Sequence, residues 1–213
     1  MSRLVAFGCS LTYGHGLDDC YIPPKDSSLY GPGLEPSKTA WPSTLGKLLN
    51  VDTVINKGHP GASNKYIWKT ALDFDFQQDD IVFINWSYPN RYCIFEDFKN
   101  KHIPIGPWFD NKQNKVYYKQ LYTDIDHTID FFNRSDHVKR YLDSLNIKNF
   151  HAITLFNKEP INLTPKWYNV DILKSCFLTI SQNYPLGLDN AHPNQAAHDH
   201  YANDLFLEIK DKL

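Results

Sequence analysis

Residues 3–11 near the start of the chain read RLVAFGCSL. The apolar run over residues 4–7 is typical of a buried parallel strand, and Gly8 permits a turn directly after it. In open α/β sheets, ligands bind beyond the carboxyl ends of the strands. Because Ser10 follows the strand by three residues, we expect its hydroxyl at that edge. The other interpretation of Ser10 is a helix N-cap, a common use of a serine after a strand.

The same strand pattern recurs at residues 53–55, 81–84 and 152–156, each bounded by Gly, Pro or Asn. Helical spacing falls between these runs: at 41–49, at 63 or 64 to 72, at about 128–145, and after Pro193. Strands alternating with helices predict an α/β fold with a doubly wound, mainly parallel sheet flanked by helices. The length of 213 residues suits a single domain, residues 1–213.

Two stretches, at about 12–38 and 88–126, interrupt this alternation and are predicted to be insertions. The first is rich in Gly and Pro and follows Ser10. The second is dense in aromatic residues, which argues against disorder and favours a hairpin or a small subdomain. Both should leave the sheet at its carboxyl edge, where they would help to form a binding crevice.

Composition excludes several classes of function. A formal net charge of −2 gives no electrostatic argument for nucleic acid or an anionic membrane as a partner. No apolar run reaches the roughly 18 residues that span a bilayer, and the start does not have the pattern of a signal peptide, so we expect a cytoplasmic protein. The four cysteines have no CxxC spacing and are predicted to be free, buried thiols.

The most informative polar motif lies near the other end, where residues 189–194 read DNAHPN. An Asp three residues before a His can bind Nδ1 of its ring and leave Nε2 free for a serine hydroxyl. Ser10, Asp189 and His192 are therefore the candidate catalytic residues, with surface roles for the pair as the alternative. Cys9 is a less favoured nucleophile, because no partner motif prefers its thiol to the adjacent hydroxyl.

Metal and nucleotide sites are not expected. His198 and His200 are two apart on the predicted last helix and so face different directions. The glycines at 8, 14 and 16 match neither a Walker motif nor G-x-G-x-x-G. In contrast, residues 56–64, NKGHPGASN, follow the second strand, and Gly61 there could bring a backbone N–H close to a ligand.

Together, residues 8–11 (GCSL), 56–61 and 189–194 resemble the conserved blocks of the SGNH (GDSL-like) hydrolase superfamily, with Cys9 in place of the usual Asp. The resemblance implies a flavodoxin-like three-layer sandwich, a Ser10–His192–Asp189 triad, oxyanion donors at Ser10 and Gly61, and no cofactor or metal. The family's G-x-N-D block is missing. Residues 85–91 read NWSYPNR instead, with Ser87, Tyr88, Asn85 and Asn90 as replacements for its oxyanion asparagine. This version of the block resembles that of divergent family members, including ones encoded by bacteriophages. If the protein is phage-encoded, the resemblance implies that it could be associated with the virion.

The sequence thus predicts a serine esterase, acting on a small-molecule or glycan ester such as an acylated carbohydrate. The alternative is an SGNH-fold module with weak or no turnover that binds a glycan or a protein. Arg91 and Trp108 are candidate substrate-binding residues. Arg91 would clamp a carboxylate or phosphate, unless it forms a structural ion pair at the base of the loop. The sequence leaves the oligomeric state open.

Overall fold

The fold is built on four parallel strands in the order β4-β1-β5-β8. The computed structural model describes residues 2–22, 31–154 and 164–213. The strands are β1 (Arg3–Gly8), β4 (Thr53–Gly58), β5 (Asp80–Trp86) and β8 (Lys148–Ile153). Val5 pairs with Ile55 on one side and with Val82 on the other. Beyond β8, a single parallel bridge joins His151 to Ile172. The prediction of a doubly wound parallel sheet is confirmed.

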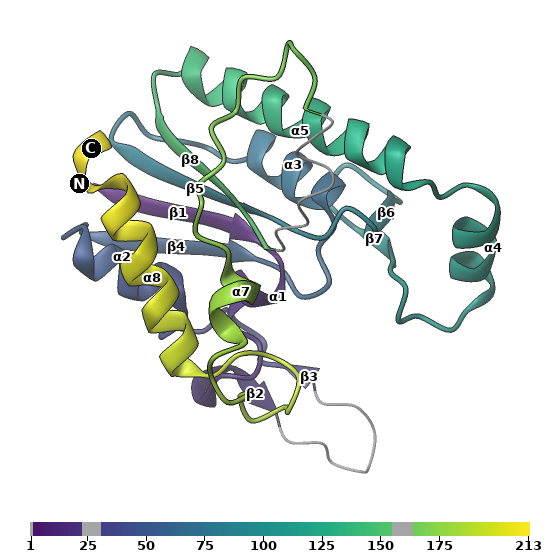
Figure 1. Cartoon of the computed structure of the whole chain (residues 1–213), viewed down its shortest axis with the longest axis horizontal. Coiled ribbons are helices and arrows are strands. Elements are labelled where there is room, and N and C mark those ends of the chain that lie inside the picture. The colour runs from purple at the N-terminus through teal and green to yellow at the C-terminus, as the bar shows by residue number, and fades with distance from the viewer. Residues whose placement is uncertain (1, 23–30, 155–163) are drawn as a thin grey trace.

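Helices cover both faces of this sheet (Figure 1). One face carries α2 (Trp41–Leu48) and α8 (Gln195–Ile209), and the other carries α3 (Asn64–Leu72) and α5 (Asp124–Ser144). Alternate strand residues supply the two cores. Phe83 packs on Trp41 of α2, whereas Trp86 packs on Phe131 of α5. Because both faces are buried, the strands read as continuous apolar runs.

Most predicted elements are present with shifted ends. Ser63, not Asn64, caps α3: its side chain accepts a hydrogen bond from the backbone N–H of Tyr66. Helix α5 begins four residues earlier than the predicted 128, because Thr123 caps it. The strand predicted at 152–156 begins at Lys148 instead. Its first residues are polar and so lack the apolar pattern of a buried strand. Residues 155 and 156 of that prediction lie outside the described residues, as do residues 23–30 of the first insertion.

The second insertion forms a hairpin and a helix. Its strands are β6 (Tyr92–Phe95) and β7 (His102–Ile105), which pair antiparallel, and α4 (Lys112–Gln120) follows. Helix α1 (Ser10–Tyr13) leads into the first insertion, whose described part holds a 3-10 turn (Asp18–Cys20) and the short pair β2 (Tyr21–Ile22) and β3 (Gly31–Pro32). Helix α7 (Phe177–Ser181) precedes the 189–194 motif, and a 3-10 turn (Lys210–Lys212) follows α8.

Two sequence expectations concern the chain as a whole. All four cysteines are free and buried, as predicted. Over the described ranges, none of the helices combines the length and the apolar character that crossing a membrane requires.

Candidate active site

Ser10 lies where the first strand of the sheet ends. It is the first residue of α1, directly after Cys9, which occupies the N-cap position without a side-chain hydrogen bond to the helix backbone. The alternative in which Ser10 caps a helix is therefore wrong. The Ser10 side chain is nearly buried, with 5% of the residue exposed. Its position at the carboxyl edge follows from the strand and turn that the sequence encodes.

Asp189 and His192 lie on one tight turn that reaches this edge. Asp189 Oδ1 accepts hydrogen bonds from the backbone N–H groups of Ala191 (3.0 Å) and His192 (2.9 Å). Asn190 takes a positive φ of 54°, a conformation that asparagine tolerates better than most residues. The turn is closed by a hydrogen bond from Gly187 N–H to the His192 carbonyl (2.7 Å). Asn194 then caps α8.

The three candidate catalytic side chains form one hydrogen-bonded series. His192 Nδ1 donates to Asp189 Oδ2 at 2.5 Å, and the Ser10 hydroxyl donates to His192 Nε2 at 3.0 Å. Burial opposes the charge on Asp189, but the two backbone donors and the His192 ring outweigh it and hold the pKa of the carboxyl below its ordinary value. Asp189 is therefore a carboxylate at neutral pH. Because a carboxylate can only accept, it selects the His192 tautomer with the proton on Nδ1, in which Nε2 accepts from Ser10.

A second histidine, His15, lies against this series and had not been singled out from the sequence. Its ring packs on that of His192 with centroids 4.3 Å apart, and its Nε2 lies 3.7 Å from Asp189 Oδ2. Burial, with a smaller contribution from His192, lowers the pKa of His15, so it is neutral at neutral pH. The sequence signal for His15 was weak, because it is a lone histidine between Gly14 and Gly16.

His15, Asp189 and His192 also bring potential metal-ligand atoms within 4.8 Å of one another. Both ring nitrogens of His192 are already hydrogen-bonded, one to Asp189 and one to Ser10. A metal ion on His192 would have to displace one of these bonds. The donor set thus fits a hydrogen-bonded triad with an added histidine better than a metal centre.

The loop of residues 59–63 lies beside α1. Asn56 donates a hydrogen bond to the Thr12 carbonyl (2.7 Å), and His59 N–H donates to the Gly8 carbonyl (3.0 Å). Gly61 takes a φ of +74°, and a Cβ added there would meet no atom within 4 Å. Gly61 is thus on an open part of the neighbouring loop, but it does not line the cavity beside Ser10.

The segment that replaces G-x-N-D follows β5. Ser87 is buried; its N–H donates to Asn64 Oδ1 (2.7 Å), and its hydroxyl oxygen accepts from Arg91 Nη1 (3.2 Å). This leaves the hydroxyl hydrogen of Ser87, not its amide, as the available donor. Asn85 is buried within β5, whereas the Asn90 carbonyl accepts from Tyr118.

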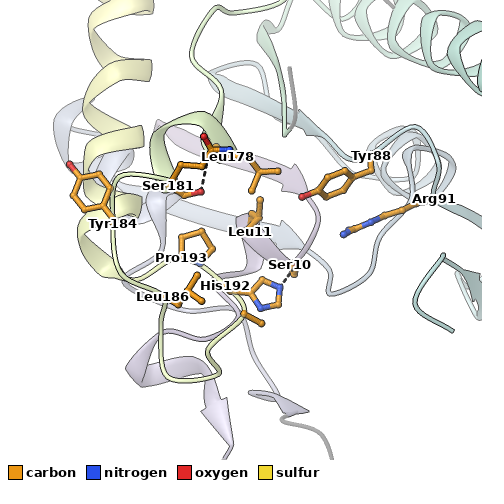
Figure 2. Close-up of a pocket in the computed structure, with 12 residues that line it drawn as sticks. Ser10, Leu11, Tyr88, Arg91, Leu178, Ser181, Tyr184, Leu186, His192 and Pro193 are labelled. Atoms are coloured by element: carbon orange, nitrogen blue, oxygen red, sulfur yellow. Dashed lines mark hydrogen bonds between the residues drawn. The ribbon is translucent and has the colours of Figure 1, made fainter. Parts of the chain in front are cut away.

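A cavity of about 420 Å³ opens beside Ser10 and His192 (Figure 2). Tyr88 and Arg91 point into it from one side. The opposite wall is formed by α7 and the following segment, a contribution that the sequence did not suggest: Leu178, Ser181, Gln182, Tyr184, Leu186, Ala191 and Pro193.

Trp108 is not in the wall but stacks on Arg91, with the guanidinium carbon 4.6 Å from the ring centroid. Arg91 forms no ion pair with any described residue, so the structural ion pair considered for it is absent from this part of the chain.

Comparison with known proteins finds similarity at the level of structure. No protein-family model and no curated protein sequence matches the chain. A carbohydrate esterase family 2 enzyme with a carbohydrate-binding domain from Corynascus thermopiles (Myceliophthora fergusii) superposes with a TM-score of 0.60 at 14% identity, over 98% of this chain and 65% of that one. The aryl esterase of M. smegmatis gives a TM-score of 0.55 at 12% identity, and a lipolytic protein of the G-D-S-L family from Veillonella parvula gives 0.51 at 12%; both matches cover 100% of each chain. With its parallel sheet and flanking helices, the chain has the α/β fold of the SGNH (GDSL-like) hydrolases.

Proposed function

We propose that the protein is a serine ester hydrolase in which Ser10 is the nucleophile, His192 the general base and acid, and Asp189 the residue that orients His192. The observation that carries the proposal is the hydrogen-bonded series from Ser10 through His192 to the ionised Asp189. A serine hydroxyl is a weak nucleophile on its own and needs an adjacent base that is itself held in one tautomer.

In this mechanism the Ser10 oxygen attacks the ester carbonyl while His192 Nε2 takes the hydroxyl proton. The imidazolium that forms is stabilised by Asp189, and it delivers the proton to the departing alcohol. Water then attacks the acyl-enzyme with His192 again acting as the base. No step requires a metal or an organic cofactor.

The negative charge on the carbonyl oxygen needs donors. We assign this role to the N–H of Ser10, which lines the cavity, and, from the family resemblance of their segments, to the N–H of Gly61 and the hydroxyl of Ser87, which lie outside its lining. The third donor is the hydroxyl of Ser87 and not its amide, because the amide N–H already donates to Asn64 Oδ1. Loss of a single oxyanion donor costs on the order of 10²–10³ in turnover. Ser87 is thus the residue on which the efficiency of this divergent site depends.

The substrate class that we propose is an acylated small molecule or carbohydrate. Carbohydrate esterases share the fold, and a cavity of about 420 Å³ has the size of sites for small ligands. A second candidate is a non-catalytic glycan- or protein-binding module. The missing G-x-N-D block and the 49% exposure of Trp108 favour that alternative.

A serine-directed fluorophosphonate probe separates the two. We expect the probe to add its mass to the peptide that contains Ser10, and we expect Ser10→Ala to abolish both labelling and nearly all hydrolysis of 4-nitrophenyl acetate while the fold is retained. Members of a triad act as a unit, so a single loss costs several powers of ten.

Ser181→Ala is the matched control, since it removes a hydroxyl from the wall of the same cavity. It should still be labelled. If Ser10→Ala hydrolysed esters at half the parental rate, Ser10 would not be the nucleophile. If the parental protein were folded yet unlabelled and inactive, the binding module would be favoured.

A further inference from the structure

Arg91 is a cation held beside the nucleophile without a described acidic partner. It lines the cavity together with Ser10 and His192, and its guanidinium points inward (Figure 2). Among the described residues, the lining includes no Asp or Glu, and no carboxylate pairs with Arg91. The nearby Asp189 is already bound by His192 and two backbone N–H groups. The cavity wall therefore carries a positive charge that the wall itself does not neutralise.

Aromatic rings hold this guanidinium in place. The Arg91 guanidinium carbon lies 4.4 Å from the ring centroid of Tyr88 and 4.6 Å from that of Trp108. Trp108 is itself positioned by a close contact, since a Cβ at Gly106 would lie 2.5 Å from the indole ring. The Gly106 N–H is fixed in turn by the buried Asn114 side chain (2.8 Å). Arg91 is thus held in place by other residues of the second insertion (88–126) rather than extended into solvent.

The guanidinium also has unused hydrogen-bond capacity. Nη1 donates to the Ser87 hydroxyl oxygen (3.2 Å). Nε is buried and has no acceptor among the described residues. An arginine carries five N–H donors in a planar fork that matches a carboxylate or phosphate.

We propose that Arg91 binds a negatively charged group of the substrate, so that the preferred substrates are esters whose alcohol or acyl part carries a carboxylate or similar oxyanion. The proposal rests on the ester hydrolase function proposed above and specifies its substrate class. An acylated carbohydrate that bears an acidic group belongs to this class. The contact from Arg91 to Ser87 would link binding of the anion to the residue assigned to the oxyanion.

The competing role for Arg91 is purely one of positioning, in which it only orients the Ser87 hydroxyl. The two roles differ in a measurable way. A positioning residue affects neutral and charged esters alike, whereas an anion-binding residue affects their ratio.

Matched pairs of esters test the difference. For charge on the alcohol, the pair is 3-acetoxybenzoate and 3-acetoxybenzamide; for charge on the acyl group, it is 4-nitrophenyl hemiglutarate and 4-nitrophenyl 5-methylhexanoate, with uncatalysed rates subtracted. The parental protein should prefer the charged member of at least one pair by about tenfold or more in kcat/KM. A ratio near one in both pairs would overturn the proposal.

Arg91→Gln should bring that ratio close to one. Arg140→Gln is the matched control: it removes the same charge from an exposed position of α5, where Arg140 pairs with Asp136, and should keep the parental ratio. If Arg91→Gln lowered kcat/KM equally for both members, Arg91 would be a positioning residue only and the proposal would fail.

Binding to the Ser10→Ala variant provides a test that requires neither turnover nor a change at Arg91. By calorimetry, intact 3-acetoxybenzoate or hemiglutarate ester should bind about tenfold more tightly than its neutral partner, and that advantage should shrink as ionic strength rises from about 0.02 to 0.5 M. Equal affinities within both pairs, or an advantage insensitive to salt, would refute anion binding. Failure of the parental protein to hydrolyse any ester would refute the proposed function and leave this binding comparison valid.

Discussion

Gly16 shows how closely the chain packs around the carboxylate of the candidate triad. It takes a φ of +90°, and a Cβ added there would lie 2.7 Å from Asp189 Oδ1. Its carbonyl accepts a hydrogen bond from Leu188 N–H (2.9 Å), which ties the loop after α1 to the turn that carries Asp189 and His192. Two segments more than 170 residues apart in sequence are thus joined at the site.

We therefore predict that Gly16→Ala displaces Asp189 and lowers kcat/KM for ester hydrolysis by about 10²-fold, since small misplacements in a site have costs of that size. Gly61→Ala is the comparison for stability, because Gly61 has a similar positive φ but no atom within 4 Å of the added Cβ. Both variants lose about 1–2 kcal/mol to the left-handed backbone. Urea unfolding of the two variants would isolate the cost of the contact with Asp189. Equal losses of stability in both, together with a parental kcat/KM for Gly16→Ala, would contradict the displacement of Asp189.

At this scale the sequence named residues that the structure brings together where a motif combined residue types with a spacing. Ser10, Asp189 and His192 could be named because a nucleophile after a strand and an Asp-x-x-His pair each have a chemical meaning. His15 could not, since its contact with His192 arises from tertiary packing between distant loops. The hydrogen bond of the Ser87 amide was likewise unpredictable, because its partner Asn64 lies at the start of α3, distant in the sequence.

Among the elements, the second insertion (residues 88–126) forms a small core of its own. Tyr92 of β6 stacks on Tyr117 of α4 with ring centroids 5.2 Å apart, and the Tyr117 hydroxyl bonds His127 of α5 (2.6 Å). The sequence indicated a hairpin or subdomain here but not its elements, because aromatic residues at irregular spacing have no clear period. Only the base of the insertion, at Tyr88 and Arg91, lines the cavity, and Trp108 reaches it through Arg91.

We predict that the insertion influences substrate choice through this contact. Trp108→Ala should change the ratio of kcat/KM between 4-nitrophenyl octanoate and 4-nitrophenyl acetate by about 2- to 5-fold, because an exposed cation–π contact contributes about 0.5–1 kcal/mol. Trp167→Ala is a matched control, since Trp167 is 48% exposed against 49% for Trp108. Tyr118→Ala, which removes the hydrogen bond to the Asn90 carbonyl, tests the base of the insertion in the same assay. An unchanged ratio for Trp108→Ala, with stability intact, would contradict the prediction.

For the whole molecule, the parallel sheet and its flanking helix layers could be predicted because apolar runs and helical periods alternate along the chain, whereas the strand order came only from the structure. Element ends were less predictable, since caps such as Thr123 and polar strand residues such as Lys148 act against the local pattern. Two histidines whose burial the sequence did not predict, His151 and His198, are buried in the folded molecule. Trp86 Nε1 donates to His151 Nδ1 (3.1 Å), and the Trp41 backbone N–H donates to His198 Nδ1 (3.2 Å).

This burial predicts a loss of stability in acid. Burial lowers the pKa of His151 and of His198 from 6.5 to about 3, so both stay neutral in the folded protein while the unfolded chain takes up their protons below pH 6.5. Their contribution is fully present above pH 6.5 and is lost as the pH falls toward 3. Each proton gained on unfolding lowers the free energy of unfolding by about 1.4 kcal/mol per pH unit.

Urea unfolding followed by fluorescence between pH 7 and pH 4 would measure this slope. His151→Gln should reduce the slope by the equivalent of one proton, about 1.4 kcal/mol per pH unit. If the slope of His151→Gln equalled that of the parental protein, His151 would not be the group responsible.

The four buried thiols have a practical consequence. Cys9, Cys20, Cys93 and Cys176 are each at most 5% exposed, and burial raises the pKa of Cys20 and of Cys93, which keeps these two thiols protonated and unreactive. Maleimide reagents should therefore leave the native protein unmodified. A single cysteine introduced on the surface, for example at the exposed Val116 of α4, could then carry a fluorophore or spin label without prior removal of native cysteines. Movement of the insertion relative to the sheet would become directly observable in the otherwise wild-type protein.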